Sequence, residues 1–192
     1  MAPEDPDLDL VRALQAGDEN ALRTLMDRYG KRLFVFIFRH IRNEADAFDL
    51  IQETFTRVYF NIGKFRPTAK FVTWLYRIAL NLCRDQARRR ARRQSQTIST
   101  EERTEKNERQ TQVIADTHDL GWQIEQREKL RALGEAISEL PQSLKSPLIL
   151  TALEGRSHIE AGELLGISPK AVEVKVYRAR KVLLARMQEM GF

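Results

Sequence analysis

The polar side chains Asp49, Gln52 and Glu53 form the most compact group in this sequence that could bind a partner. They recur at steps of three and four residues, so one face of a helix would present all three. Carboxylates are repelled by the phosphates of nucleic acids, and this face therefore suits a basic protein partner. A solvated helix surface is the alternative, because charged residues at helical spacing usually face water.

A dense run of arginines follows further along the chain. Within residues 84–93 the arginines are Arg84, Arg88, Arg89, Arg90, Arg92 and Arg93. Asn81, Arg84 and Arg88 lie at helical spacing and share one stripe of a helix. Guanidinium groups bind phosphates, and a net charge of +5 with 31% charged residues is typical of a protein that meets a polyanion. We therefore expect this stripe to contact DNA.

Aromatic residues precede the arginine run. Phe65 and Lys70 bound an expected loop, 65–70, and Phe71 and Trp74 begin the helix that follows. Exposed aromatic rings stack on bases drawn out of a duplex, and a loop beside a basic helix can form a pocket for such a base. Phe71 and Trp74 also fall on the apolar stripe of their helix, so packing in the core stays open for both.

The C-terminal part has the pattern of a helix-turn-helix. Gly162 is small where the first helix must approach the second, and Gly166 can take the left-handed conformation of the turn. Ser168 followed by Pro169 is a strong start signal for the second helix. A helical hairpin used only for packing is the alternative. The start of the helix and its outward and flanking positions, where a base-reading helix meets DNA, carry Ser168, Lys170, Glu173, Val174, Tyr177 and Arg178.

The sequence contains no pattern typical of catalysis or of metal binding. Cys83 has no histidine at helical spacing and is expected to be a buried structural thiol, and His40, His118 and His158 lack the spacing of metal ligands. We therefore expect no enzymatic activity, no metal and no cofactor. The N-terminus has no apolar core of a signal peptide, and no apolar run approaches a membrane span. These features predict a cytoplasmic protein without membrane insertion.

Helical periodicity dominates the chain, and no stretch of alternating β-branched residues suggests a sheet. Apolar stripes within 7–93 predict a compact helical domain. Residues 94–122 are rich in Gln, Thr, Ser, Glu and Arg, which predicts a flexible acidic linker. Apolar periodicity resumes over 123–189 and predicts a second helical domain that contains the helix-turn-helix. The expected fold is all-α, with two helical domains joined by the linker.

Local signals place the individual helices. Asp18 is expected to cap the N-terminus of a helix that begins after it. The next helix should end at Gly63 and face the core with Phe48, Ile51, Phe55, Val58, Tyr59 and Ile62. In the second domain we expect helices that run from about Gln123 to Leu140, from Leu144 to Gly155, over 157–165 and from Pro169 onwards.

These residues resemble two conserved regions of the bacterial sigma-70-family factors. The match to region 2 consists of Asp49–Phe55, Phe71–Ala79, Asn81 and Arg88–Arg90. The match to region 4 lies within 132–186 and includes Leu140-Pro141, Gly155, Gly166–Ser168 and Val176–Arg180. The linker stands in place of region 3, which is the arrangement of the extracytoplasmic-function (group IV) sigma factors. The resemblance covers nearly the whole chain.

The resemblance implies an RNA polymerase sigma factor that directs promoter recognition and DNA melting in a stress or environmental response. Region 2 would bind the β′ clamp helices of core RNA polymerase through Asp49, Gln52 and Glu53. It would capture and melt the −10 promoter element through Phe65, Lys70, Phe71, Trp74, Asn81, Arg84 and Arg88. Region 4 would meet the β flap and read the −35 element through Ser168, Lys170, Glu173, Val174, Tyr177 and Arg178. The two elements would lie about 25 base pairs, or roughly 85 Å, apart, and an anti-sigma factor would be a further partner.

The sequence departs from the family pattern at three positions. Ala161 stands where the family often has Ile or a similar apolar residue, and Ile159 stands where an acidic residue is common. Glu173 stands where a basic residue is frequent. Its carboxylate could accept from a cytosine amino group, or it could pair on the helix surface with Lys170 or Tyr177. A stand-alone transcriptional regulator with a helical sensor domain is the alternative function, and only a sigma factor would require core polymerase.

Overall fold

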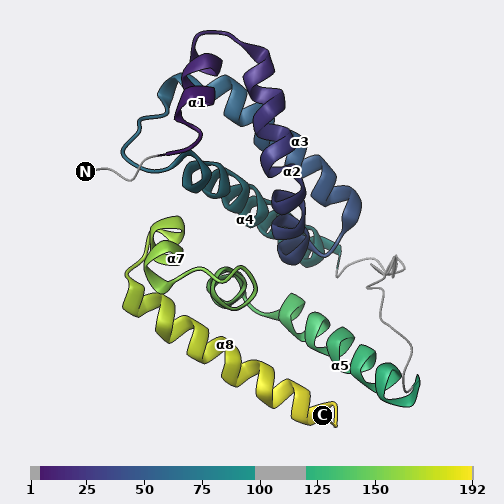
Figure 1. Ribbon diagram of the computed structural model, residues 1–192. Helices are drawn as coiled ribbons and strands as arrows, with labels where there is room; N and C mark the ends of the chain where they lie inside the picture. The colour runs from purple at the N-terminus through teal and green to yellow at the C-terminus, as the bar shows by residue number, and fades with distance from the viewer. Residues whose placement is uncertain (1–4, 98–119, 192) are drawn as a thin grey trace.

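The computed structural model describes residues 5–97 and 120–191, and the regular structure in these ranges is entirely helical (Figure 1). The first unit contains α1 (Leu8–Gln15), α2 (Glu19–Ile41), α3 (Glu44–Asn61), a 3-10 turn (Ile62–Lys64) and α4 (Phe71–Thr97). The second unit contains α5 (Leu120–Glu139), α6 (Gln142–Leu148), a π-helical turn (Ile149–Leu153), α7 (His158–Leu165) and α8 (Pro169–Glu189). The predicted all-α fold in two helical units is confirmed.

The ends of the predicted linker differ from the structure. α4 continues to Thr97, and α5 begins at Leu120, so helix extends into both ends of the segment 94–122. The rest of the predicted linker lies outside the described residues. The predicted domain boundaries at 93 and 123 therefore fall inside helices.

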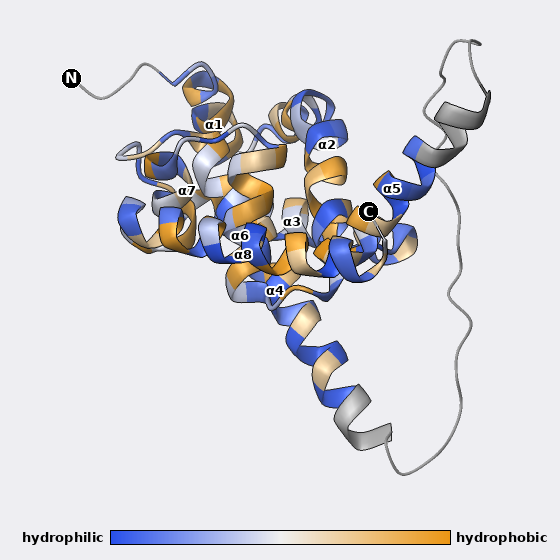
Figure 2. Cartoon of the chain, turned by 90° about the horizontal axis from the view of Figure 1, so that it is seen from below, coloured by the Kyte–Doolittle hydropathy of each residue, from blue (hydrophilic) through white to orange (hydrophobic). Residues whose placement is uncertain are grey.

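The core of the first unit forms where α2 and α4 pack together. Leu33 and Phe36 of α2 and Phe71 and Leu75 of α4 are fully buried, and burial of side chains of this size stabilises a fold by about 1.5–3 kcal/mol each. Figure 2 shows the apolar positions turned towards the neighbouring helices. The predicted cap at Asp18 is confirmed, because its carboxylate accepts from the backbone N–H of Asn20 at 2.9 Å.

A buried carboxylate, Asp7, holds α1 against α2. Asp7 is fully buried and accepts hydrogen bonds from the Tyr29 hydroxyl and the Arg28 guanidinium. Burial, together with the hydrogen bond to Asp7, raises the pKa of the Tyr29 hydroxyl well above its usual value. The sequence pattern did not predict this contact, because an acidic residue near a chain end ordinarily faces water.

The second unit differs from its prediction around Pro147. The helix begins at Gln142 rather than Leu144 and contains Pro147, which has no N–H to donate within the helix. A wider π-helical turn follows, in which the Glu154 N–H reaches the Ile149 carbonyl at 3.0 Å. The inner stripe of α8 is buried and consists of Val172, Val176, Ala179 and Leu183.

The two units touch along α4, whose neighbour in the second unit is α7 (Figure 1). The Arg77 guanidinium donates to the Glu163 carbonyl at 2.8 Å. The Arg156 guanidinium lies 5.2 Å from the centre of the Tyr76 ring, which is a cation–π distance. On α2, Arg39 forms an ion pair with Glu154 and donates to the Leu153 carbonyl at 3.0 Å. α4 is thus packed on both units.

Removal of the Asp7 carboxylate should loosen the first unit. Asp7→Ala leaves the buried Tyr29 hydroxyl without its acceptor, so we expect the free energy of unfolding to fall by about 1–3 kcal/mol. Urea denaturation of the full chain measures this. Asp9→Ala is the matched control, because the Asp9 side chain is 99% exposed, and it should change the stability by less than about 0.5 kcal/mol. Equal effects of the two substitutions would contradict the anchoring role.

Candidate nucleic-acid and protein interfaces

The predicted acidic face lies on α3. Asn43 caps this helix by accepting from the Asp46 N–H at 2.9 Å. Asp49 and Gln52 are exposed, and the half-buried Glu53 carboxylate accepts from the Arg57 guanidinium at 2.7 Å. The three predicted residues therefore do share one accessible region, with Glu53 held in place by its neighbour.

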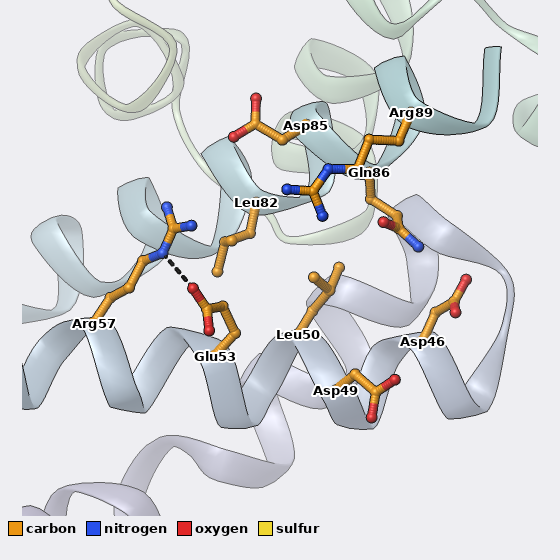
Figure 3. Close-up of a pocket in the computed structure, with 9 residues that line it drawn as sticks. All are labelled: Asp46, Asp49, Leu50, Glu53, Arg57, Leu82, Asp85, Gln86 and Arg89. Atoms are coloured by element: carbon orange, nitrogen blue, oxygen red, sulfur yellow. Dashed lines mark hydrogen bonds and ion pairs between the residues drawn. The ribbon is translucent and has the colours of Figure 1, made fainter. Parts of the chain in front are cut away.

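A cleft of about 460 Å³ separates this part of α3 from α4 (Figure 3). Leu50 of α3 and Leu82 of α4 extend towards each other at its floor, and Asp85 and Arg89 of α4 line the opposite side. The α4 side of the cleft thus carries one acidic and one basic side chain. A partner that binds here would meet four carboxylates, two guanidinium groups and one amide around an apolar floor.

Two aromatic residues of α3 that were expected in the core are exposed instead. Phe48 is 53% exposed and Tyr59 is 40% exposed. The Phe48 ring packs on Phe34 at the rim, with 4.8 Å between ring centres, and the Tyr59 hydroxyl donates to Glu19 at 3.1 Å. The prediction was wrong because the apolar stripe of α3 is wider than the face that α2 and α4 cover. Phe48 and Tyr59 therefore flank Gln52 on the accessible side of the helix.

The aromatic residues near the loop 65–70 belong mostly to the core. Phe71 is fully buried, which agrees with the core alternative left open for it, and Phe65 is 4% exposed, so the expectation of an exposed ring is wrong at Phe65. Each packs against the other and against Trp74, with 5.4–6.2 Å between ring centres in the cluster that also includes Tyr29. Trp74 is half-buried. The cluster fixes the base of the loop, because Phe65 at its start and Phe71 just after its end both pack on Trp74.

The predicted basic stripe lies along α4. Asn81 is exposed, Arg84 is half-buried, and Arg88 is exposed and stands 3.6 Å from Asp85. Burial lowers the pKa of Arg84, and the neighbouring Arg88 lowers it further. Lys70 is exposed at the end of the loop that precedes the helix. One side of α4 therefore joins a basic stripe to the aromatic base of the loop.

The helix-turn-helix has the local geometry that its sequence predicts. Ser157 and Glu160 form a capping box at the start of α7, and hydrogen bonds from the Ser157 N–H and hydroxyl lower the pKa of Glu160. Gly166 ends α7 in the left-handed conformation with φ 69°. Ser168 caps α8 by accepting from the Ala171 N–H at 3.2 Å, with Pro169 at the first helical position.

The outer face of α8 is open to solvent. Lys170, Glu173, Val174, Tyr177 and Arg178 are all exposed, and so is Ser168 at the cap. The Glu173 carboxylate accepts from the Lys170 ammonium at 2.9 Å, and this hydrogen bond lowers the pKa of Glu173. The surface pair that the sequence allowed therefore exists, and base recognition by Glu173 stays a prediction.

The remaining reactive groups have structural surroundings. Cys83 is buried, as predicted, and burial raises its pKa to about 12. His40 is packed on Phe36, and burial lowers its pKa to about 4. Within the described ranges 5–97 and 120–191, His, Cys, Asp and Glu do not gather into a group that could hold a metal ion. Over the same residues, no helix has the length and apolar character needed to cross a membrane.

Comparisons with known proteins assign a family to each unit. The family Sigma-70 region 2 matches residues 25–93, and the family Sigma-70, region 4 matches residues 130–183. The chain is 32% identical over 185 residues to the RNA polymerase sigma factor CnrH of Cupriavidus metallidurans, and this match covers 96% of each protein. It is 29% identical over 183 residues to the ECF RNA polymerase sigma factor SigW of Bacillus subtilis, and this match covers 94% of this chain and 96% of SigW.

One solved structure extends the likeness to three dimensions. The structure of CnrH in complex with the cytosolic domain of CnrY matches with a TM-score of 0.68 and 27% sequence identity. The match covers 96% of this chain and 99% of that chain. Both helical units therefore have counterparts in a solved protein.

A side chain at Gly162 should disrupt the helix-turn-helix. A Cβ atom at this position would lie 2.7 Å from the carbonyl oxygen of Ile167 in the turn. We expect Gly162→Ala to lower the free energy of unfolding by about 1–3 kcal/mol, the usual effect of overpacking, as measured by urea denaturation. Gly30→Ala is the matched control in α2, where nothing lies within 4 Å of the added Cβ, and it should raise the stability by up to about 1 kcal/mol. Similar effects at both positions would contradict the close approach.

Proposed function

This chain belongs to the sigma-70 family and to its extracytoplasmic-function group, and we propose that it binds core RNA polymerase, recognises a two-part promoter and melts the DNA. One observation supports this most directly: a single chain combines an acidic face on α3, a basic stripe on α4 and an exposed recognition helix, α8. The first suits a protein partner, and the other two suit DNA. We further propose that the chain has no catalytic activity of its own.

Core polymerase would bind on α3. Asp49 and Gln52 are accessible, and Glu53 is oriented by Arg57. Carboxylates and an amide on one helix face are suited to the basic and amide groups of another helix pair, because charge-assisted hydrogen bonds are the stronger ones. We assign this face to the β′ clamp helices. The exposed rings of Phe48 and Tyr59 beside it would add apolar contact.

The −10 element would bind along the loop 65–70 and α4. Lys70, Asn81 and Arg88 are accessible, and Arg84 is partly so. The cationic groups of Lys70, Arg84 and Arg88 would track the phosphates, while the half-buried Trp74 would offer an edge for an unpaired base. The buried Phe65 and Phe71 would support the loop from below rather than touch the DNA.

The −35 element would bind at α8. A recognition helix contacts base edges through residues of its N-terminal half, and here these residues are Lys170, Glu173, Val174, Tyr177 and Arg178. The exposed Ser168 at the cap would reach a phosphate. The same unit would meet the β flap.

The units would have to separate on a promoter. The two elements lie roughly 85 Å apart in the family arrangement, whereas α4 and α7 are in direct contact here. The contacts between them are few, and small contacts between domains usually permit relative motion. The chain would therefore be closed when free and open on the polymerase.

Regulation would fit the same picture. The CnrH structure was solved with the cytosolic domain of CnrY, and we propose that this chain likewise has an anti-sigma partner. The helices of the described residues include no membrane span, and action on core polymerase would place the protein in the cytoplasm. Release from the anti-sigma partner would couple transcription to a stress or environmental signal.

Loss of the acidic face should weaken binding to core polymerase. The triple variant Asp49→Ala, Gln52→Ala, Glu53→Ala removes polar groups from a helix surface, so the fold should persist. Each lost charge-assisted contact is worth about 1.5–3 kcal/mol, and we expect the affinity for core enzyme to fall at least tenfold. Fluorescence titration measures the affinity, and start-site-specific transcription with core enzyme tests the function.

A matched control fixes the meaning of this result. Asp9→Ala with Asp27→Ala removes two exposed carboxylates elsewhere on the same unit, and it should leave the affinity unchanged. A folded triple variant that binds core with native affinity would contradict the assignment to α3. Specific promoter binding without any need for core enzyme would instead identify a stand-alone regulator.

Glu173 should contribute to discrimination at one base pair of the −35 element. A carboxylate can accept from a cytosine amino group, and a good contact of this kind is worth about 1–3 kcal/mol. We expect Glu173→Ala to relax selection at that position and Glu173→Arg to favour guanine there, as read by promoter-library selection. Lys170→Ala breaks the surface pair but keeps the carboxylate, and because Lys170 is itself assigned to the −35 element, it should change selection only at other positions. A uniform change at every position of the element would show that Glu173 only pairs on the surface.

A further inference from the structure

A cleft of about 560 Å³ lies between the two units. α4 forms one wall. The other wall consists of α6, the end of α7 with the turn that follows it, and α8. Volumes of 300–1,000 Å³ are typical of sites for small molecules. The cleft exists only while the units are closed, because each contributes one wall.

The charge of the cleft is unbalanced. Four cations line it, Arg84 and Arg88 from the first unit and Lys145 and Lys175 from the second, and none of the described residues that line it is acidic. Burial lowers the pKa of Lys145, and Arg90 and Arg42 lower it further. Lys145 donates to the Ser138 carbonyl, and the acid beside Arg88 is Asp85, at 3.6 Å. The closed arrangement thus gathers like charges that an anion would neutralise.

The rest of the wall is mainly apolar and also includes the polar side chains of Gln142 and Ser143. Leu140, Pro147, Leu165 and Ile167 come from the second unit, and Ala87 and Ala91 come from α4. A simple inorganic anion would leave this surface uncovered. A ligand that carries both phosphates and a flat ring would use both kinds of wall, since guanidinium and ammonium groups bind phosphates and apolar side chains pack on rings.

The size of the cleft selects among anionic ligands. A helix with its side chains is about 10–12 Å across, so a volume of about 560 Å³ would hold only about one turn of it. A helical acidic peptide could therefore contact the walls with only about one of its turns. A small molecule could contact them over its whole length.

We propose that this cleft binds a small organic phosphate of the nucleoside polyphosphate class, with its phosphates on the four cations and its ring on the apolar wall. Such a ligand touches both units and so stabilises the closed arrangement over the open one. Arg84 and Arg88 also belong to the proposed −10 stripe, so the bound ligand would compete with DNA. This second consequence rests on the proposed function, whereas the binding itself does not.

The test is calorimetric titration of the full chain, without polymerase, with ATP, tripolyphosphate and adenosine as probes. ATP should bind, tripolyphosphate should bind more weakly, and adenosine should bind weakest. Lys175→Gln should weaken ATP binding at least tenfold, because it removes one phosphate contact. Lys181→Gln is the matched control on the exposed side of the same helix and should bind ATP as the native chain does. Circular dichroism verifies folding, and Lys145→Gln is a second variant that should show the same loss.

Each other outcome overturns the proposal. ATP and tripolyphosphate of equal affinity would show that the apolar wall takes no part. Equal binding of an oligo-glutamate peptide of matched charge would identify a site for acidic polypeptide. Absence of ATP binding at millimolar concentration, or equal loss in Lys181→Gln, would remove the site altogether. Because polymerase is absent from these titrations, failure here leaves the sigma-factor assignment untouched.

Discussion

The double packing of α4 is the constraint on which the rest of the structure depends. Its inner face, with Leu75, Ala79 and Cys83, completes the core of the first unit. Its flank, with Tyr76 and Arg77, carries contacts to the second unit, and Arg39 of α2 adds an ion pair. The basic stripe proposed for DNA runs along the same helix. The core of the first unit, contacts to the second unit and the basic stripe proposed for DNA therefore all lie on α4.

This sharing would allow the chain to adopt the two arrangements that we propose. The core face is apolar and deeply buried, so the first unit holds α4 firmly. The polar contacts to the second unit are a cation–π pair, an ion pair from Arg39 of α2 and hydrogen bonds to backbone carbonyls. Partly exposed polar contacts of this kind contribute little each, and the positive charge gathered in the cleft opposes them. The second unit can therefore leave α4 without damage to the first.

Local signals allowed much of the fold and part of the site to be predicted. Ser168 with Pro169 and the glycines Gly162 and Gly166 act within a few residues of their own positions, so their capping, close approach and turn were all foreseeable. The helical periodicity of apolar residues likewise placed the helices. The signals failed where the apolar stripe of a helix is wider than the face that its neighbours cover. The sequence of α3 does not reveal how much of its stripe α2 and α4 will cover, and Phe48 is exposed as a result.

Long-range contacts were beyond the reach of sequence patterns. Arg39 forms an ion pair with Glu154, 115 positions away in the sequence. The residues near either one do not indicate this partner. The same holds for Asp7, whose burial follows from the position of Tyr29 on another helix, and for the π-helical turn after Pro147. The interfaces with polymerase and DNA remain proposals, because exposure and charge identify an accessible surface but not its partner.

The separation of the two units on a promoter is the central claim, and a distance measurement tests it most directly. Nitroxide labels at Ala69→Cys and His158→Cys would report on the loop before α4 and on the start of α7, while the native Cys83 is buried and should stay unlabelled. Pulsed electron paramagnetic resonance should give a single short distance in the free chain. That distance should disappear in the complex with core polymerase and promoter DNA. The same short distance in both samples would contradict the account.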